Sequence, residues 1–119
     1  MIDLANLNCV PCRKGSPRLS AEEIARSMAD LPAWQVLEFD NAPRLVRVLK
    51  FKDFSSALAF ANQIGVIAAA EDHHPVLLVE WGRLTVSWYT HAIGGLHQND
   101  LIMAAKTDHL HQTLLSAQP

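Results

Sequence analysis

The sequence predicts an α+β domain: a four-stranded antiparallel sheet with three helices on one face, in the order α-β-β-α-β-β-α. Four short segments of alternating apolar residues come in two pairs, and each pair is joined by a turn-forming segment. Three longer segments repeat apolar residues at helical spacing. Strands that arrive as hairpins form antiparallel sheets, and helices then cover one face of such a sheet.

The first helix is expected to begin after Ser20, because Ser20 and Glu23 form a capping-box pattern. Apolar residues follow at helical spacing until Pro32, which ends the helix. Alternating, β-branched residues then predict strands at residues 34–39 and 44–51, joined by a turn of several residues. These two strands form the first hairpin.

Asp53 is expected to cap a second helix that ends near residues 70–72. The apolar stripe of this helix comprises Phe54, Ala57, Leu58, Ala61, Ile64 and Ala68. Pro75 pushes His74 out of the helical conformation, so an extended segment must follow.

The second hairpin is predicted at residues 76–81 and 84–90, with Gly82-Arg83 as a type II′ turn. A last helix is expected from Asn99 to Leu115, with Asn99 as its N-cap. Helices on one face of two hairpins complete the predicted fold.

Composition sets the broad class of protein. The chain has 119 residues and is 50% hydrophobic, which suits one domain; we expect a flexible N-terminal arm at residues 1–18 and a single domain at 19–119. A net charge of -2 argues against nucleic acid or an anionic membrane as a partner. The sequence has no apolar run of the roughly 20 residues that span a bilayer, and residues 1–8 lack the features of a signal peptide. A cytoplasmic location is expected.

Two cysteines form the pattern Cys9-Val10-Pro11-Cys12. Such a pair is typical of half a zinc site or of a redox site. The sequence has no second pair to complete a zinc site, and no predicted strand precedes it as in thioredoxin-like proteins. We therefore expect two reduced thiols without an essential role.

Three histidines are expected to meet at one end of the second hairpin. His73 and His74 precede its first strand, and His91 follows its second. Counting outward from the predicted turn brings His74 level with His91. Asp100, in the first turn of the last helix, is in reach to orient an imidazole. Because the unperturbed pKa of histidine lies near neutral pH, this cluster suits proton transfer.

Two other interpretations of the histidines remain open. Neighbouring histidines in a loop are often exposed polar residues without a role. Three histidines can also hold zinc with one open position, although His73 and His74 should point apart at an extended junction. The other histidines, His97, His109 and His111, are interpreted as surface or interface residues.

A longer pattern surrounds the cluster. The string Glu71-Asp72-His73-His74-Pro75 is followed at set spacings by Trp81, His91 and Asp100. Together with residues 49–54, Gly95-Leu96 and Trp34, it resembles the signature of the pterin-4a-carbinolamine dehydratases over about residues 19–115. One departure is Ala69, where many members carry an acid four residues before the first histidine.

The resemblance implies an enzyme that removes water from a 4a-hydroxytetrahydropterin and yields quinonoid dihydropterin. It implies His73 and His91 as acid–base residues, His74 as a ligand-orienting residue and Asp100 as their support. Further binding residues would be Asp72, Pro75, Tyr89, Thr90 and Trp34. It implies no metal and no cofactor, the pterin being the substrate.

The resemblance also implies partners. Members form homodimers or homotetramers through helices, and they recycle the pterin cofactor of aromatic amino acid hydroxylases such as phenylalanine hydroxylase. Animal members also act as the dimerisation partner of a transcription factor. A non-catalytic regulatory role, or a metal-dependent hydrolase that uses the three histidines, are the alternative functions.

Overall fold

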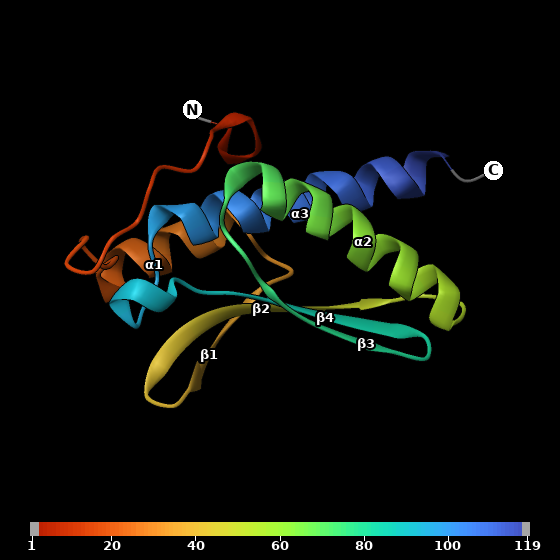
Figure 1. The fold of residues 1–119 in the computed structure, drawn as a ribbon, viewed down its shortest axis with the longest axis horizontal. Helices are drawn as coiled ribbons and strands as arrows, with labels where there is room; N and C mark the ends of the chain where they lie inside the picture. The colour runs from red at the N-terminus through yellow and green to blue at the C-terminus, as the bar shows by residue number, and fades with distance from the viewer. Residues whose placement is uncertain (1–2, 118–119) are drawn as a thin grey trace.

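The computed structural model describes residues 3–117 and has the predicted α+β architecture (Figure 1). Four antiparallel strands form one sheet in the order β1-β2-β4-β3, and α1, α2 and α3 cover one face. The elements are η1 (Leu4–Asn6), α1 (Ala21–Ser27), η2 (Met28–Asp30), β1 (Gln35–Phe39), β2 (Ala42–Lys50), α2 (Phe54–Glu71), β3 (Val76–Glu80), β4 (Arg83–Trp88), η3 (His91–Ile93) and α3 (Gln98–Ala117). Residues 1–2 and 118–119, the ends of the expected arm and domain, lie outside the described residues.

The core lies between the sheet and the helices. Its fully buried side chains include Leu45, Leu49, Leu84, Val86 and Trp88 from the sheet, with Phe60, Ile64 and Met103 from the helices. The helix-facing side of β2 matches the predicted alternation. No helix of the described residues is both long and apolar enough to cross a bilayer.

The predicted stripe of α2 is correct except at its start. Ala57, Ala61, Ile64 and Ala68 are buried, as is Phe60, which was not predicted. Phe54 and Leu58 were predicted to be buried but are 45% and 42% exposed. Buried positions at i, i+3, i+4 and i+7 from residue 57 define a face that leaves Phe54 and Leu58 at its margin.

The first hairpin is tighter than predicted. Phe39 pairs with Ala42, so Asp40-Asn41 forms a two-residue turn and not a turn of several residues. Both turn residues have positive φ, 51° and 64°, as a type I′ turn requires. Pro43 lies in β2 beyond the part that pairs with β4, where the missing N–H costs no bond to that strand.

The turn of the second hairpin lies one residue earlier than predicted. Glu80 pairs with Arg83, so the turn residues are Trp81 and Gly82. Gly82 is the second of them and has φ 73°, which rules out the predicted type II′ turn with glycine first. The register shifts by two residues, so each side chain keeps its predicted face. Continued beyond the strands, this register brings His73 level with Thr90, so the prediction that His74 is level with His91 was wrong by two residues.

Asp53 caps α2 and links its stability to pH. Its Oδ1 accepts the Ser56 N–H at 2.8 Å, and this bond lowers the pKa of Asp53 below its ordinary value of 3.8. The charged cap therefore stabilises the fold above pH 3.8, and this contribution is lost as the pH falls through the lower folded-state pKa.

We expect Asp53→Asn to retain a cap but to lose less stability in acid than the native protein. Asparagine is an effective N-cap residue and does not titrate. Urea unfolding at a series of pH values below and above 3.8 measures the difference. Asp30→Asn, which removes an exposed carboxylate elsewhere, is the control; an unchanged acid dependence in Asp53→Asn would contradict the prediction.

Candidate active site

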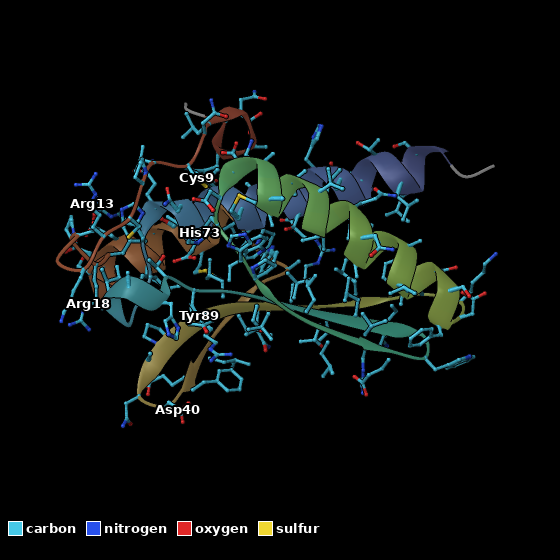
Figure 2. All side chains as sticks on the ribbon, viewed as in Figure 1. Cys9, Arg13, Arg18, Asp40, His73 and Tyr89 are labelled. Atoms are coloured by element: carbon cyan, nitrogen blue, oxygen red, sulfur yellow. The ribbon has the colours of Figure 1, made fainter. Side chains whose placement is uncertain are left out.

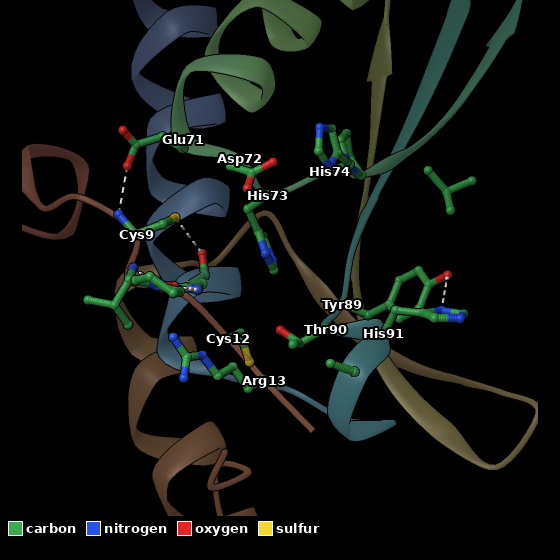
Figure 3. A pocket seen from close by; sticks show the side chains of 16 residues that line it. Cys9, Cys12, Arg13, Glu71, Asp72, His73, His74, Tyr89, Thr90 and His91 are labelled. Atoms are coloured by element: carbon green, nitrogen blue, oxygen red, sulfur yellow. Dashed lines mark hydrogen bonds between the residues drawn. The ribbon is translucent and has the colours of Figure 1, made fainter. Parts of the chain in front are cut away.

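A cavity of about 720 Å³ opens at the end of the sheet where α2 gives way to β3 (Figure 3). This is the size of a small-molecule site. Three stretches line it: residues 71–76, residues 89–92 and residues 9–13 of the N-terminal arm, with Asn99 between them. His73, His74 and His91 all lie on its wall. The convergence expected from the hairpin is therefore present.

The centre of the site is a buried histidine–carboxylate pair. Nε2 of His73 lies 2.7 Å from Oδ1 of Asp100. Thr90 donates its hydroxyl to Oδ2 of Asp100 at 2.6 Å. Asp100 is fully buried and His73 is 8% exposed. The carboxylate lies behind the cavity wall and supports His73 from beneath.

The end of α2 sets the position of His73. Asp72 adopts the left-handed conformation, with φ 52° and ψ 42°, and its N–H bonds back to Ala68 and Ala69. The His73 N–H also donates to the carbonyl of Ala68, at 3.1 Å. These bonds close the helix as C-caps do. The imidazole then stacks on Trp88, with a centroid distance of 6.0 Å and an interplanar angle of 10°.

The start of α3 sets the position of Asp100. The His97 N–H donates to Oδ2 of Asp100 at 3.0 Å, and Nδ1 of His97 accepts the Asn99 N–H at 3.0 Å. His97 therefore takes the capping role predicted for Asn99, and its side chain is half-buried. Nε2 of His73, the Thr90 hydroxyl and the His97 N–H give the buried carboxylate three donors, as an acceptor-only group needs.

His74 and His91 are exposed, in contrast to His73. In Figure 3 they lie across the cavity from Cys9, with His73 between. Nδ1 of His91 lies 3.3 Å from the Tyr89 hydroxyl. The Arg44 guanidinium sits 4.2 Å from the centroid of the Tyr89 ring, a cation–π distance. The imidazoles of His74 and His91 thus face solvent, and Arg44 of β2 supports the Tyr89 ring beside His91.

The other two histidines lie on α3. His109 is exposed, as predicted. His111 is half-buried and meets the Phe60 ring edge-on at 5.8 Å, so it is partly a core residue. Burial and the neighbouring Arg47 lower the pKa of His111. Neither histidine lines the cavity.

Seven of the residues expected at the site share this cavity: Asp72, His73, His74, Pro75, Tyr89, Thr90 and His91. Trp34 does not. It is 4% exposed, packs in the core, and donates its Nε1–H to Asp108 at 2.8 Å. Arg47 also pairs with Asp108. The expectation that Trp34 flanks the ligand is therefore corrected, because its polar atom is used in the core.

Sequence reasoning missed the arm as a wall of the site. The segment from Cys9 to Arg13 lines the cavity although it lies about 60 residues before the first histidine. Local patterns carry no signal for a contact of this sequence separation. Trp88 was also missed, although its alternation with Val86 on the core face of β4 could have placed it beneath the histidine.

Both cysteines are half-buried free thiols. Burial, followed by the nearby Glu71 carboxylate, raises the pKa of Cys9 to about 12. Only the thiolate is a good nucleophile or metal ligand, so Cys9 is an unreactive thiol. Within residues 3–117, no three His, Cys, Asp or Glu side chains are grouped to hold a metal ion.

Comparisons with known proteins agree on one family. The family model "Pterin 4 alpha carbinolamine dehydratase" matches residues 17–110. A protein of Chlorobaculum tepidum named "Putative pterin-4-alpha-carbinolamine dehydratase" is 52% identical over 92% of this chain and 99% of its own length. A protein of Microcystis aeruginosa with the same name is 50% identical over 94% of this chain and 97% of its own length. The crystal structure of a transcriptional coactivator/pterin dehydratase from Brucella melitensis superposes with a TM-score of 0.72 at 33% identity, over 79% of this chain and 98% of the other.

Proposed function

This chain belongs to the pterin-4a-carbinolamine dehydratase family, and on that premise we propose that it catalyses the dehydration of a 4a-hydroxytetrahydropterin to quinonoid dihydropterin. The enzyme class is hydro-lyase. The observation that carries the proposal is the cavity itself. It gathers three histidines from two segments around a buried His73–Asp100 pair, and its volume suits a bicyclic pterin.

The reaction needs two proton transfers. The C4a–O bond breaks, the lone pair of a ring nitrogen forms the new C=N bond, and the ring loses a proton. Hydroxide is a poor leaving group, so an acid must protonate the oxygen as it departs. A base must accept the ring proton. Each well-positioned transfer contributes about 10²–10⁴-fold to the rate.

We assign the two transfers to His73 and His91, which enter the cavity from different segments. The hydrogen bond between Asp100 and Nε2 of His73 fixes the orientation of that ring for the transfer. His91 is exposed and free to exchange protons with water. His74 carries no hydrogen bond from another described side chain and is assigned to ligand orientation.

The remaining wall binds the ring. Asp72, Pro75, Tyr89 and Thr90 are the proposed contacts, and the apolar surface of Pro75 and the Tyr89 ring can pack against the bicyclic ring system. The product is an oxidised pterin that a reductase must recycle. We therefore propose a role in regenerating the pterin cofactor of an aromatic amino acid hydroxylase.

A direct assay tests the proposal. A phenylalanine hydroxylase generates the 4a-carbinolamine in place, and its decay is followed by absorbance. The protein is expected to accelerate this decay in proportion to its concentration. Decay at the spontaneous rate at every protein concentration would overturn the proposed activity.

We also propose that the reaction uses neither a metal nor an organic cofactor. The imidazoles supply both proton transfers, and the histidines of the cavity are not grouped as metal ligands within the described residues. Dialysis against EDTA should leave the dehydration rate unchanged, with metal content measured by mass spectrometry. Loss of the dehydration rate with EDTA and its return with zinc would instead overturn the metal-free mechanism.

Self-association is a further part of the proposal. The sheet face opposite the helices exposes Leu37, Phe39, Val48, Val76 and Leu78. The outer side of α2 exposes Phe54, Leu58 and Val66. Several exposed apolar side chains on one face of a sheet are typical of a protein interface. Sedimentation velocity is expected to give a homodimer or homotetramer, and a monomer at micromolar concentration would contradict this.

A further inference from the structure

We infer that the N-terminal arm is a clamp that positions the His73–Asp100 pair. By clamp we mean residues 9–13 with their bonds to Glu71 and Asn99. The inference rests on the proposed function, because it assigns positioning residues to that same site. The family match begins at residue 17, so the clamp lies outside the matched region.

One end of the clamp holds the end of α2. The Cys9 N–H donates to Oε1 of Glu71 at 2.6 Å (Figure 3). Glu71 is the last residue of α2 and is separated from His73 by a single residue. A charged acceptor makes this a strong hydrogen bond. The arm therefore restrains the helix end from which His73 projects.

The other end of the clamp holds the start of α3. The Val10 N–H donates to Oδ1 of Asn99 at 3.0 Å, and Nδ2 of Asn99 donates back to the Val10 carbonyl at 2.7 Å. Asn99 is 2% exposed, and it directly precedes Asp100. The Asn99 amide thus pairs with both the N–H and the carbonyl of Val10, as the backbone of a neighbouring strand would.

Further contacts anchor the arm on both sides of the clamp. Before it, Lys106 donates its ammonium to the Ala5 carbonyl at 2.9 Å, and η1 packs on α3. After it, the Leu19 N–H donates to the Leu96 carbonyl at 2.8 Å. Arg18 lies against Gly95 so closely that an added Cβ would come within 2.6 Å of it. Figure 2 shows the arm at the same end of the molecule as His73.

These contacts make a bridge between two helix ends. The last turn of α2 carries His73, and the first turn of α3 carries Asp100. Helix ends fray unless other groups hold them. The His73–Asp100 bond joins the two ends directly, and the clamp joins them one residue before Asp100 and two before His73. A misplacement of about 1 Å at reacting groups can cost about 10²-fold in rate.

Val10→Pro tests the clamp from the arm side, because it removes the N–H bonded to Asn99 and leaves both helices unaltered. We expect kcat/KM for dehydration to fall about tenfold, mainly through kcat. We also expect the ¹⁵N resonance of His73 Nε2 to move away from its native position as the bond to Asp100 loosens. Glu71→Ala and Asn99→Leu should act in the same direction.

Lys14→Ala is the control for activity, since Lys14 is an exposed arm residue outside the clamp. Val10→Ala keeps the N–H and should keep the native His73 resonance. Native kcat/KM in Val10→Pro and Glu71→Ala would overturn the inference. So would a lower rate with an unchanged His73 resonance, because the arm would then be only a wall. An inactive native protein would instead refute the proposed function, while the resonance still tests the clamp.

Discussion

Replacement of His73 by alanine is expected to lower kcat for pterin dehydration by about 10²–10⁴-fold, the contribution of one positioned proton transfer. The imidazole is held by Asp100 and by the Trp88 ring, and the backbone N–H of His73 bonds the Ala68 carbonyl, which fixes the residue at the end of α2. Such restraint fixes the ring for proton transfer. Absorbance of the carbinolamine at saturating substrate measures kcat.

The expected loss must be separated from a loss of folding. His73→Ala leaves one oxygen of the buried Asp100 without its donor, so we add His73→Gln, whose amide can donate there. Circular dichroism and a cooperative urea transition report folding in both. Both variants should be folded and strongly impaired. His109→Ala, an exposed histidine on α3, should retain the native rate.

His91→Ala should show a loss of the same order with a smaller effect on folding. Its ring is exposed and contacts chiefly Tyr89, so little buried structure depends on it. His74→Ala should raise KM more than it lowers kcat, because His74 is assigned to ligand orientation. Near-native kcat in both His73→Ala and His91→Ala would refute the histidine mechanism while leaving the dehydratase activity to be explained otherwise.

Most of the fold follows from local patterns. The Ser20 capping box, the Asp53 cap and the alternation of β2 are interactions between residues near in sequence, and all three were predicted correctly. The cluster of His73 with His91 also followed, because a hairpin brings its ends together whatever its turn. Misplacing the turn by one residue shifted the pairing of β3 with β4 by two residues, so each side chain still lies on its predicted face of the sheet.

The errors at the site have a different origin. Asn99 and Asp53 look alike as cap residues, but only Asp53 uses its side chain to cap. The amide of Asn99 bonds Val10, 89 residues away, and His97 caps α3 in its place. Trp34 was similarly bound to Asp108, 74 residues away. A polar side chain near a predicted site can bond any of several groups, and which of them lies within hydrogen-bond distance depends on the tertiary fold.

The buried carboxylate is the part of the site on which both folding and chemistry depend. Asp100 joins the end of β4, the end of α2 and the start of α3 through Thr90, His73 and His97. An isosteric amide keeps the shape but replaces one acceptor oxygen with a donor. One of the three donors must then lose its partner or, in the case of His73, change tautomer so that Nε2 accepts from the amide; a lost partner costs about 1–3 kcal/mol for a buried group. Since His73 is among them, its orientation is expected to suffer as well.

Asp100→Asn is therefore expected to lower both the free energy of unfolding, by about 1–3 kcal/mol, and kcat, by about 10²-fold. Urea unfolding and the carbinolamine assay measure the two effects on the same preparation. Asp108→Asn is a matched control on α3: it weakens the contacts with Trp34 and Arg47 outside the cavity. It should lose stability and keep its kcat. Of the two aspartates, only Asp100 contacts His73. Equal loss of kcat in both variants would therefore show that Asp100 acts through general destabilisation.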